Sequence, residues 1–441
     1  MLRLLNKQFE QVDNSPLVLF RVAFGVLIMA ESFGAILTGW VRRAMVEPDF
    51  NFTLIGFEWM QPFEGNGMYY YFSIMGVLGL FIAIGFYYKI SLLSFTVMWS
   101  IVYWMQKSFY NNHYYLLILL CLFMLIVPAN AYFSVDAKLK NSIRSLTCRR
   151  WCLNVFIVQL LIVYTYASLH KFYPGWLEGD FISIAFSAKR NYWLIGGWLQ
   201  NELLQKVVIY GGIIFDGTII ILLLIPYTRK AAFVVSIFFH LFNSVVFQIG
   251  IFPYLMIATS LFFFPPEKIK GIFFKRKPAM PNYSPVEQLS IAQQVTLFAF
   301  FAFFCIQIYL PLRHHLYKGD VFYTEEGHRL AWRMMLRTKS GNLSYEVKNL
   351  KNDSTWMVQP RDFLTRKQSR AITSKPDMIW QFAQYLEEQY QKEGIEDVSI
   401  KAISKVRLNS GPSHQLIDPN IDLTEVKWQP LKHSDWILSP K

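Results

Sequence analysis

Long runs of apolar residues are the feature that most limits how this chain can fold. A helix needs about 20 mainly apolar residues to cross the hydrocarbon core of a bilayer, so such a run with few charges predicts a membrane span. Several runs of this kind are present, and the one over residues 151–169 contains no charged side chain. Only 17% of the residues are charged, against roughly a quarter in soluble domains. The sequence therefore predicts a polytopic α-helical membrane bundle.

Nine segments are expected to cross the membrane and to form a transmembrane domain over residues 1–312. Their bounds are 16–40, 68–88, 90–106, 114–127, 151–169, 207–227, 231–250, 251–264 and 294–312. The eighth segment is short for a full span, so we expect it to tilt or to begin at the membrane interface.

The positions of the basic residues predict the orientation of the bundle. The net charge of +13 would also suit a nucleic-acid-binding protein, but most Lys and Arg residues lie in short loops between the spans. The basic loops follow the second, fourth, sixth and eighth spans, which places them on one face together with the N-terminus. An excess of Lys and Arg marks the cytoplasmic face. We therefore expect a cytoplasmic N-terminus, a C-terminal domain on the outer or lumenal side, and no nucleic-acid partner.

Residues 313–441 have the composition of a soluble domain. Alternating polar and apolar residues at 343–347 and 398–406 predict β-strands. Pro376 begins an amphipathic pattern that predicts a helix through about Lys392. These elements predict a soluble α+β, β-rich domain after the membrane bundle.

A lysine directly after the fifth span is the first candidate for chemistry. Lys171 follows His170 and precedes a turn at Pro174 and Gly175, with Trp176 next. An amine held at the edge of a hydrocarbon phase loses hydration, which disfavours its charged form, and a neutral amine can act as a general base. The alternative is structural: a snorkelling lysine at the end of a membrane helix, with Trp176 in the interfacial aromatic belt.

Two further polar clusters lie at the edge of the predicted spans or within them. Asn111, Asn112 and His113 stand at the start of the fourth span. The seventh span and its end carry His240, Asn243, Ser244 and Gln248. Helical spacing places the second cluster on one face, and a polar face of this kind avoids lipid. A structural seam of hydrogen bonds between helices is the alternative interpretation.

The predicted topology brings both clusters and the Lys171 loop to the same side of the membrane. The result is a pocket with an amine, two imidazoles, amides and many aromatic residues, which suits an amphiphilic aromatic molecule from the bilayer, such as a quinone. No CxxC pair or metal-ligand spacing is present, so no metal site is expected. We interpret the other charges within the spans, Arg21, Glu31 and Asp216, as buried structural pairs.

At these residues the sequence resembles the vitamin K-dependent gamma-carboxylase family, with an HTTM-type membrane domain. The matching stretches are YNNHYYL (110–116), HKFYPGWLEG (170–179), FHLFNS and IGIFPY (239–254), LPLRHHLYKG and AWRMM (310–335), and LIDPNIDL and VKWQP (416–430). The similarity extends over nearly the whole chain in the same order. It implies nine membrane helices and a lumenal β-rich domain.

The resemblance also implies a reaction. Lys171 matches the weak base that deprotonates vitamin K hydroquinone, either menaquinol or phylloquinol. Oxygen then converts this cofactor to an alkoxide that removes the γ-hydrogen of a peptide glutamate, and the carbanion attacks carbon dioxide. Asn112 and His113 match residues that contact the quinone oxygens or support later steps, and His240 matches a further pocket histidine. No side chain can remove that hydrogen near neutral pH, so the cofactor must supply the strong base.

These arguments assign the candidate site residues. The predicted catalytic residues are Lys171 and His113. The predicted cofactor contacts are Asn111, Asn112, His170, His240, Asn243 and Trp176. The predicted contacts with the peptide substrate are His314, Tyr323 and Trp332.

The expected partners are the lipid bilayer, a glutamate-containing peptide or protein, and a quinone reductase that regenerates the cofactor. The cysteines of the family's interdomain disulfide are absent here, which favours a bacterial inner membrane over the endoplasmic reticulum. Two alternatives stay open. One is an enzyme that oxidises a quinol without carboxylating a peptide, and the other is a non-catalytic membrane scaffold or transporter.

Overall fold

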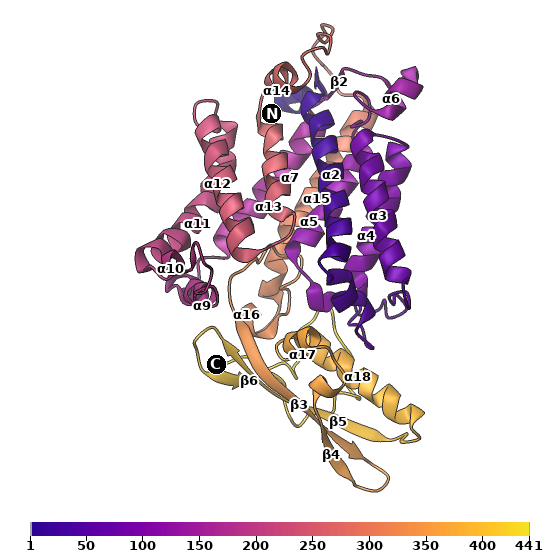
Figure 1. The fold of residues 1–441 in the computed structure, drawn as a ribbon, viewed down its shortest axis with the longest axis vertical. Helices are drawn as coiled ribbons and strands as arrows, with labels where there is room; N and C mark the ends of the chain where they lie inside the picture. Colours follow the sequence, from indigo (N-terminus) through magenta and orange to yellow (C-terminus); the bar gives the residue numbers. More distant parts are fainter. Residues whose placement is uncertain (1, 441) are drawn as a thin grey trace.

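Nine helices of the membrane domain correspond to the nine predicted segments. The computed structural model describes residues 2–440, and its longer helices run side by side along the long axis of the molecule (Figure 1). These helices are α2 (Ser15–Leu37), α3 (Gly67–Ile84), α4 (Tyr88–Met105), α5 (Asn112–Ile126), α7 (Trp151–Leu169), α11 (Glu202–Leu224), α12 (Arg229–Phe247), α13 (Phe252–Thr259) and α15 (Ile291–Leu312).

The number of helices that meet the criteria of length and composition for a membrane span is lower than the predicted nine. Six helices among the described residues are long and apolar enough to cross a bilayer: α2, α3, α7, α11, α12 and α15 with the turn that follows it. The apolar helices α5 and α13 are shorter, α13 even when the 3-10 turn that follows it is included (Phe252–Phe263), and α4 is not among the six. A multi-pass membrane protein is therefore confirmed, whereas the predicted count of nine is not.

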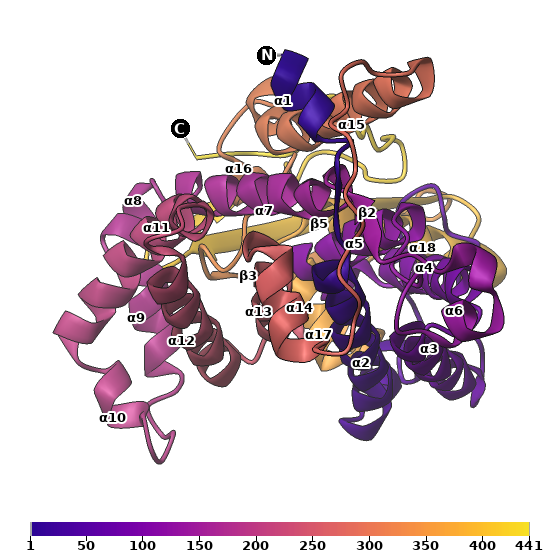
Figure 2. The same ribbon diagram turned by 90° about the horizontal axis from the view of Figure 1, so that it is seen from above.

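Short elements connect the long helices. They are α1 (Leu2–Lys7), α6 (Val135–Leu139), α8 (Pro174–Leu177), α9 (Asp180–Ser187), α10 (Gly196–Leu199), α14 (Pro266–Phe273) and the antiparallel pair of β1 (Gln11–Asp13) and β2 (Thr147–Arg149). The segment from α8 to α10 folds out to one side of the bundle between α7 and α11 (Figure 2). The loop after α7 thereby lies next to α11 and α12, where the candidate site is found.

Helices α2 and α3 approach each other at glycines. A Cβ atom at Gly25 would lie 2.3 Å from the backbone nitrogen of Ala83, and one at Gly79 would lie 2.7 Å from that of Met29. Such close contact needs small residues, which are typical of helix interfaces in membranes.

Arg21, on α2, is buried and donates hydrogen bonds to the carbonyl groups of residues 129, 132 and 133. It therefore does not form the ion pair that the sequence suggested.

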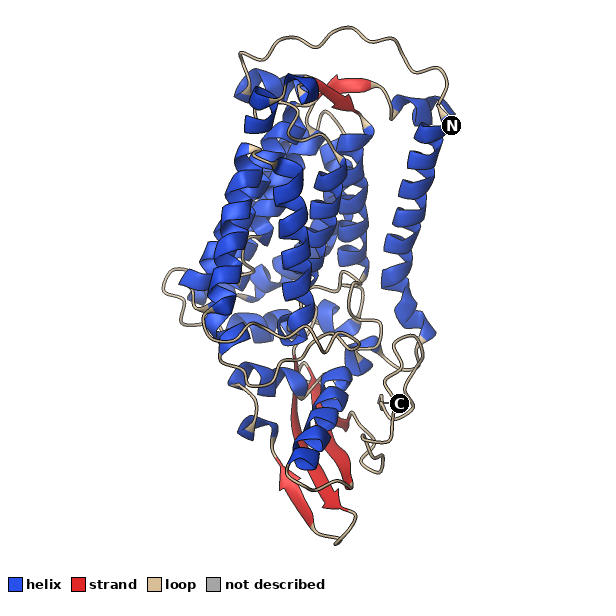
Figure 3. Cartoon of the chain, turned by 90° about the vertical axis from the view of Figure 1, so that its right-hand side faces the viewer, coloured by secondary structure: helices blue, strands red, loops and turns tan. Residues whose placement is uncertain are grey.

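Helix α15 lies apart from the other helices along most of its length (Figure 3). Only 11% of its most apolar stretch is buried. It contacts the bundle from its middle onward: Phe300 and Phe303 pack against Trp151 and Phe123. Towards its C-terminal end, Tyr115 donates to the side chain of Gln307 at 3.0 Å and Tyr166 donates to the carbonyl of Ile308 at 2.7 Å.

The C-terminal part is an antiparallel sheet covered by two helices. The strands are β3 (Lys339–Asn349), β4 (Thr355–Val358), β5 (Val398–Leu408) and β6 (Ser413–Gln415), in the order β4-β3-β5-β6. The helices are α17 (Arg366–Ile372) and α18 (Pro376–Lys392), and the short α16 (Val321–Thr324) precedes β3. Tyr345 on β3 donates to the carbonyl of Ile379 on α18 at 2.9 Å. The predicted helix and both predicted strands are present, and the strands extend beyond their expected bounds.

Several contacts attach this sheet to the membrane domain, and two of them are deeply buried. Phe52, in the loop after α2, is fully buried in the core of the sheet and packs against Phe382 on α18. Asp377 accepts contacts from Arg329 at 2.6 Å and from Lys107 at 2.9 Å, and Lys107 follows α4. Burial alone would raise the pKa of Asp377, but the two cations hold it well below its ordinary value.

Replacing Asp377 by asparagine is expected to destabilise this contact. The change leaves Lys107 buried without its counterion, and breaking a buried pair in this way costs about 3–5 kcal/mol. Because the pKa of Asp377 is depressed in the folded state, its contribution is present above the ordinary carboxyl pKa of about 4 and is lost as the pH falls further. Thermal melting of the purified protein at several pH values measures both effects.

The exposed Asp353, which pairs only with Lys348, provides a matched control. Asp353→Asn should leave the melting temperature within error of wild type. An equal melting temperature for Asp377→Asn and wild type at neutral pH would contradict the role assigned to the buried carboxylate.

Candidate active site

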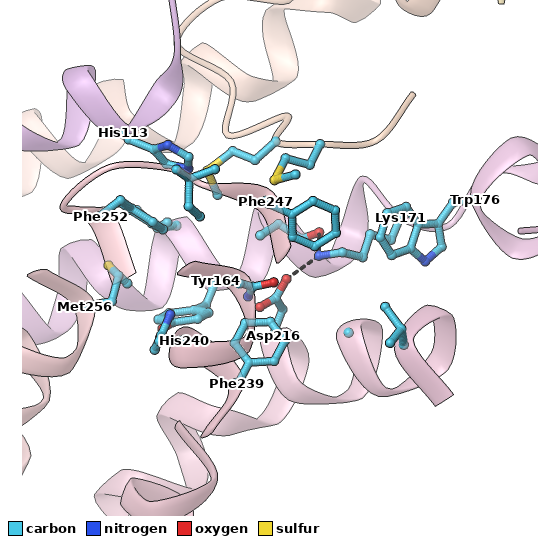
Figure 4. Close-up of a pocket in the computed structure, with 18 of the residues that line it drawn as sticks. His113, Tyr164, Lys171, Trp176, Asp216, Phe239, His240, Phe247, Phe252 and Met256 are labelled. Carbon is cyan, nitrogen blue, oxygen red and sulfur yellow. Dashed lines mark hydrogen bonds and ion pairs between the residues drawn. The ribbon is translucent and has the colours of Figure 1, made fainter. Parts of the chain in front are cut away.

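A cavity lies between α7, α11, α12 and α13 at the end of the bundle that faces the sheet (Figure 4). It encloses about 100 Å³, and about 760 Å³ when the space open to its surroundings is included. Aromatic, aliphatic and methionine side chains form most of its wall. The polar side chains in the wall are His113, Tyr164, Lys171, Asp216, His240 and Asn243. This combination is typical of a ligand site that holds an apolar molecule by a few polar contacts.

Lys171 forms an ion pair with Asp216 inside the cavity (Figure 4). Helix α7 ends at Leu169, so the side chain of Lys171 turns back and its Nζ also donates to the carbonyl of Ala167 at 3.2 Å. The same Nζ lies 5.3 Å from the ring centre of Trp176, which lines the cavity as well. Both charged side chains are buried, with exposed fractions of 10% and 7%.

From the sequence, Lys171 is a base without a partner, whereas the structure pairs it with Asp216. The Nζ of Lys171 and the carboxyl of Asp216 lie within hydrogen-bond distance, so a proton can pass between them. The pair carries no net charge whether this proton lies on the Lys171 nitrogen or on an Asp216 oxygen.

The sequence predicted a buried structural pair for Asp216 but did not identify Lys171 as its partner. Asp216 lies in the middle of α11, 45 positions after Lys171, so no local pattern connects the two. An acidic residue inside an apolar span is by itself a signal of function, because it needs a cationic or hydrogen-bonding partner. A search for a cationic partner of Asp216 in the outer half of the bundle would have identified Lys171.

His240 forms the second polar contact of the cavity. Its Nε2 lies 2.8 Å from the hydroxyl of Tyr164 on α7, and the imidazole is otherwise packed among Phe215 and Phe239. Asn243, one turn later on α12, also lines the cavity. Tyr164 was not a predicted site residue, because a tyrosine within an apolar run looks like ordinary packing.

His113 lines the cavity from the opposite side. Its ring stacks on that of Phe252 with a distance of 3.8 Å between the centres. The side chain of Asn111 caps α5 by accepting a hydrogen bond from the backbone of Tyr114, which fixes the first turn of the helix that carries His113.

Several predicted cofactor contacts lie outside this cavity. Asn112 is buried, donates to the carbonyl of Arg333 at 2.9 Å and accepts from the hydroxyl of Tyr110 at 2.9 Å. His170 stacks on Tyr166, outside the cavity wall. Burial lowers the pKa of His170 to about 3, and the guanidinium of Arg333 acts in the same direction. His170 is therefore neutral at physiological pH.

The predicted peptide contacts are not grouped at one surface. Trp332 is 1% exposed and stacks on Tyr115, so it cannot touch a peptide in this conformation. The Nδ1 of His314 donates to the carbonyl of Pro311 at 2.9 Å, and Tyr323 packs near His414. Their role in peptide binding therefore stays a prediction.

Met334 and Met335, just after Trp332, close the cavity from the side of the C-terminal sheet. They belong to the AWRMM stretch, but they were not among the predicted site residues. Across residues 2–440, no cluster of three or more His, Cys, Asp or Glu side chains could hold a metal ion.

Comparison with known proteins gives two matches that together cover most of the chain. The model of the HTTM domain matches residues 9–267, which is more than half of the sequence. The model of the lumenal domain of vitamin K-dependent gamma-carboxylase matches residues 292–441. No solved structure matches the chain.

Proposed function

Because this chain belongs to the vitamin K-dependent gamma-carboxylase family, with its HTTM membrane domain, we propose that it is an integral-membrane gamma-glutamyl carboxylase. It would couple epoxidation of vitamin K hydroquinone by molecular oxygen to carboxylation of a peptide glutamate with carbon dioxide. The observation that carries this proposal is the buried Lys171–Asp216 pair at an apolar cavity that also holds two imidazoles.

The walls of the cavity fit the ring of a quinol. Phe239, Phe247 and Phe252 offer flat apolar surfaces, and polar groups stand on different sides of the cavity, where they could bond the ring oxygens. The enclosed space is small for a bicyclic ring, so side chains must give way on binding. Met334 and Met335 suit that task, because methionine is unbranched and adapts its shape easily.

When bound, the reduced cofactor supplies, after reaction with oxygen, a base strong enough to remove the γ-hydrogen of glutamate. Lys171 accepts the first proton, from a ring hydroxyl, at its Nζ. For this step the proton shared by the ion pair lies on the Asp216 carboxyl, so the amine is free. The pair then carries one positive charge, which favours a negative charge on the adjacent ligand.

The other polar residues of the cavity would bind the cofactor ring and fix its orientation. The Tyr164–His240 contact fixes the imidazole on one side of the cavity, and the stack on Phe252 fixes His113 on the other. Asn243 is within the wall and can hydrogen-bond a ring oxygen. Closure by Met334 and Met335 excludes water, which would otherwise neutralise a strong base.

The location of the protein and its partners follow from the same proposal. The N-terminus would be cytoplasmic and the C-terminal sheet would face the outer side, where it presents a glutamate-containing peptide. A membrane quinone reductase would regenerate the cofactor. The missing interdomain cysteines favour a bacterial inner membrane.

A paired assay on the purified protein tests the proposal. Reduced vitamin K, oxygen, a glutamate peptide and carbon dioxide labelled with radioactive carbon are supplied together, and both epoxide and label in the peptide are measured. A carboxylase forms both products. Epoxide without label would identify a quinol epoxidase that lacks carboxylation, and neither product would identify a non-catalytic membrane protein.

A further inference from the structure

A second chamber adjoins the candidate active site. It lies between the C-terminal end of α2, the first turn of α5 and the loop that joins α12 to α13, and it extends to α17 in the C-terminal part. Its free volume is about 820 Å³, larger than that of the first cavity. Nothing in the proposed cofactor chemistry occupies this space.

The two cavities share one wall. His113, Ile249, Phe252 and Met335 line both of them. The interdomain cavity around Asp377, in contrast, shares no lining residue with the first cavity. Atoms that react must approach to about 3–3.5 Å, so a second substrate has to enter through a space that touches the first. The stacked rings of His113 and Phe252 stand at that boundary.

The charges of the second chamber favour an anionic ligand. Arg43, just after α2, and Lys367, on α17, line it and are exposed. Among the described residues, neither of these two side chains has a carboxylate within ion-pair distance (the ion pairs of this region involve Arg42 and Glu47). Lys367 lies 5.4 Å from the ring centre of Phe109, which also lines the chamber. Unpaired cations in a concave site attract carboxylates.

The inner end of the chamber offers further donors. Asn111 uses its carbonyl oxygen to cap α5, which leaves its amide nitrogen free to donate. Glu31 is the one acidic residue in this wall, and it lies against the backbone amide of Ile251 and the hydroxyl of Tyr114. These two donors partly neutralise its charge, so the inner end does not repel a carboxylate as strongly as a free glutamate would.

The geometry points to the second chamber as the entrance and binding site for the glutamate side chain of an acidic peptide, with Arg43 and Lys367 as the residues that select for negative charge. This inference rests on the proposed carboxylase function. The peptide would approach from the side of the C-terminal sheet, and its side chain would reach the boundary formed by His113 and Phe252.

Filling the chamber gives the first test. A Cβ atom at Gly34 meets no other atom within 4 Å, and Gly34 lines the chamber on α2. Gly34→Leu should therefore fill the space without a clash and raise the KM for a glutamate peptide about tenfold, which corresponds to about 1.4 kcal/mol. The KM for the hydroquinone should change much less. Gly211→Leu is the matched control, because Gly211 also has open space but lies in neither cavity.

Removing the two charges gives the second test. The double variant Arg43→Gln/Lys367→Gln should raise the KM for the peptide about fivefold and weaken its dependence on salt. The neighbouring pair Arg42→Gln/Arg366→Gln removes the same charge outside the chamber and should leave that KM unchanged. An unchanged peptide KM in both the filled and the uncharged variants would overturn the inference.

The outcomes separate this inference from the proposed function. If the wild-type protein incorporates no label from carbon dioxide, the carboxylase function fails and the chamber has no glutamate to bind. If the wild type carboxylates the peptide but the control and chamber variants behave alike, only the location of the peptide site is wrong. Should Gly34→Leu fail to fold, the surface charge variants decide the question alone.

Discussion

Replacement of Lys171 by alanine is expected to reduce the rate of epoxide formation from reduced vitamin K by about 10²–10⁴-fold, the usual contribution of a positioned acid or base. The variant lacks the nitrogen that accepts the ring proton, and no other amine lines the cavity among the described residues. Epoxide formed per minute by the purified protein, at saturating hydroquinone, is the quantity to compare with wild type.

A loss of activity could also arise from misfolding, because the substitution leaves Asp216 buried without its counterion. Lys171→Gln keeps a hydrogen-bond donor near Asp216 and should lose as much activity with a smaller loss of thermal stability. Lys206→Ala, at an exposed position of α11 outside the cavity, serves as the control for removal of a lysine. Epoxide formation by Lys171→Gln at the wild-type rate would exclude Lys171 as the base.

Replacement of Asp216 by asparagine is expected to lower kcat for epoxide formation about 10²-fold, because the amine loses both its fixed position and the group that takes up its proton. The shape of the pH profile should change too. The amine no longer has a neighbouring carboxylate with which to exchange its proton, so the dependence of the rate on pH should differ from that of wild type. A purely structural carboxylate would lower the activity without moving the profile.

The conservative variant Asp216→Glu retains the charge and should recover part of the rate and the wild-type pH profile. The proposed shared proton would be wrong if Asp216→Asn and wild type had the same pH profile of kcat. Rates measured across the pH range in which the protein stays folded give the profiles to compare.

The sequence predicted the helices well because their signal is local. Each apolar run from the first to the ninth became a helix, and the amphipathic pattern that begins at Pro376 ends at Lys392 in the structure as expected. The number of true spans was less certain, since α13 and α5 are apolar but short. Apolar composition alone does not report where the backbone leaves the helical conformation.

The site was predictable only in part, for a related reason. Lys171, His113, His240, Asn243 and Trp176 line one cavity as the predicted topology required. Which of their neighbours join them depends on helix rotation, which the sequence does not reveal.

Asn112 and His170 stand directly beside cavity residues in the chain. A step of one residue turns a helix position by about 100°, which separates Asn112 from His113, and His170 lies in the turn after α7. Both consequently face the segment before the C-terminal sheet instead of the cavity. The Lys171–Asp216 and Tyr164–His240 contacts are tertiary, so pattern analysis could nominate their members but not pair them.

The weak packing of α15 has a consequence for how the molecule is assembled. That helix touches the bundle along one side, from Phe300 to its last turns, whereas Phe52 and the cations around Asp377 hold the sheet against the membrane domain. The position of the sheet is therefore set by its contacts with the membrane domain and not by α15, the helix that connects the two parts of the chain. Met334 and Met335 follow α15 in the chain, so both the membrane domain and the C-terminal part contribute to the wall of the candidate active site. A change in how the two parts pack against each other therefore changes that wall directly.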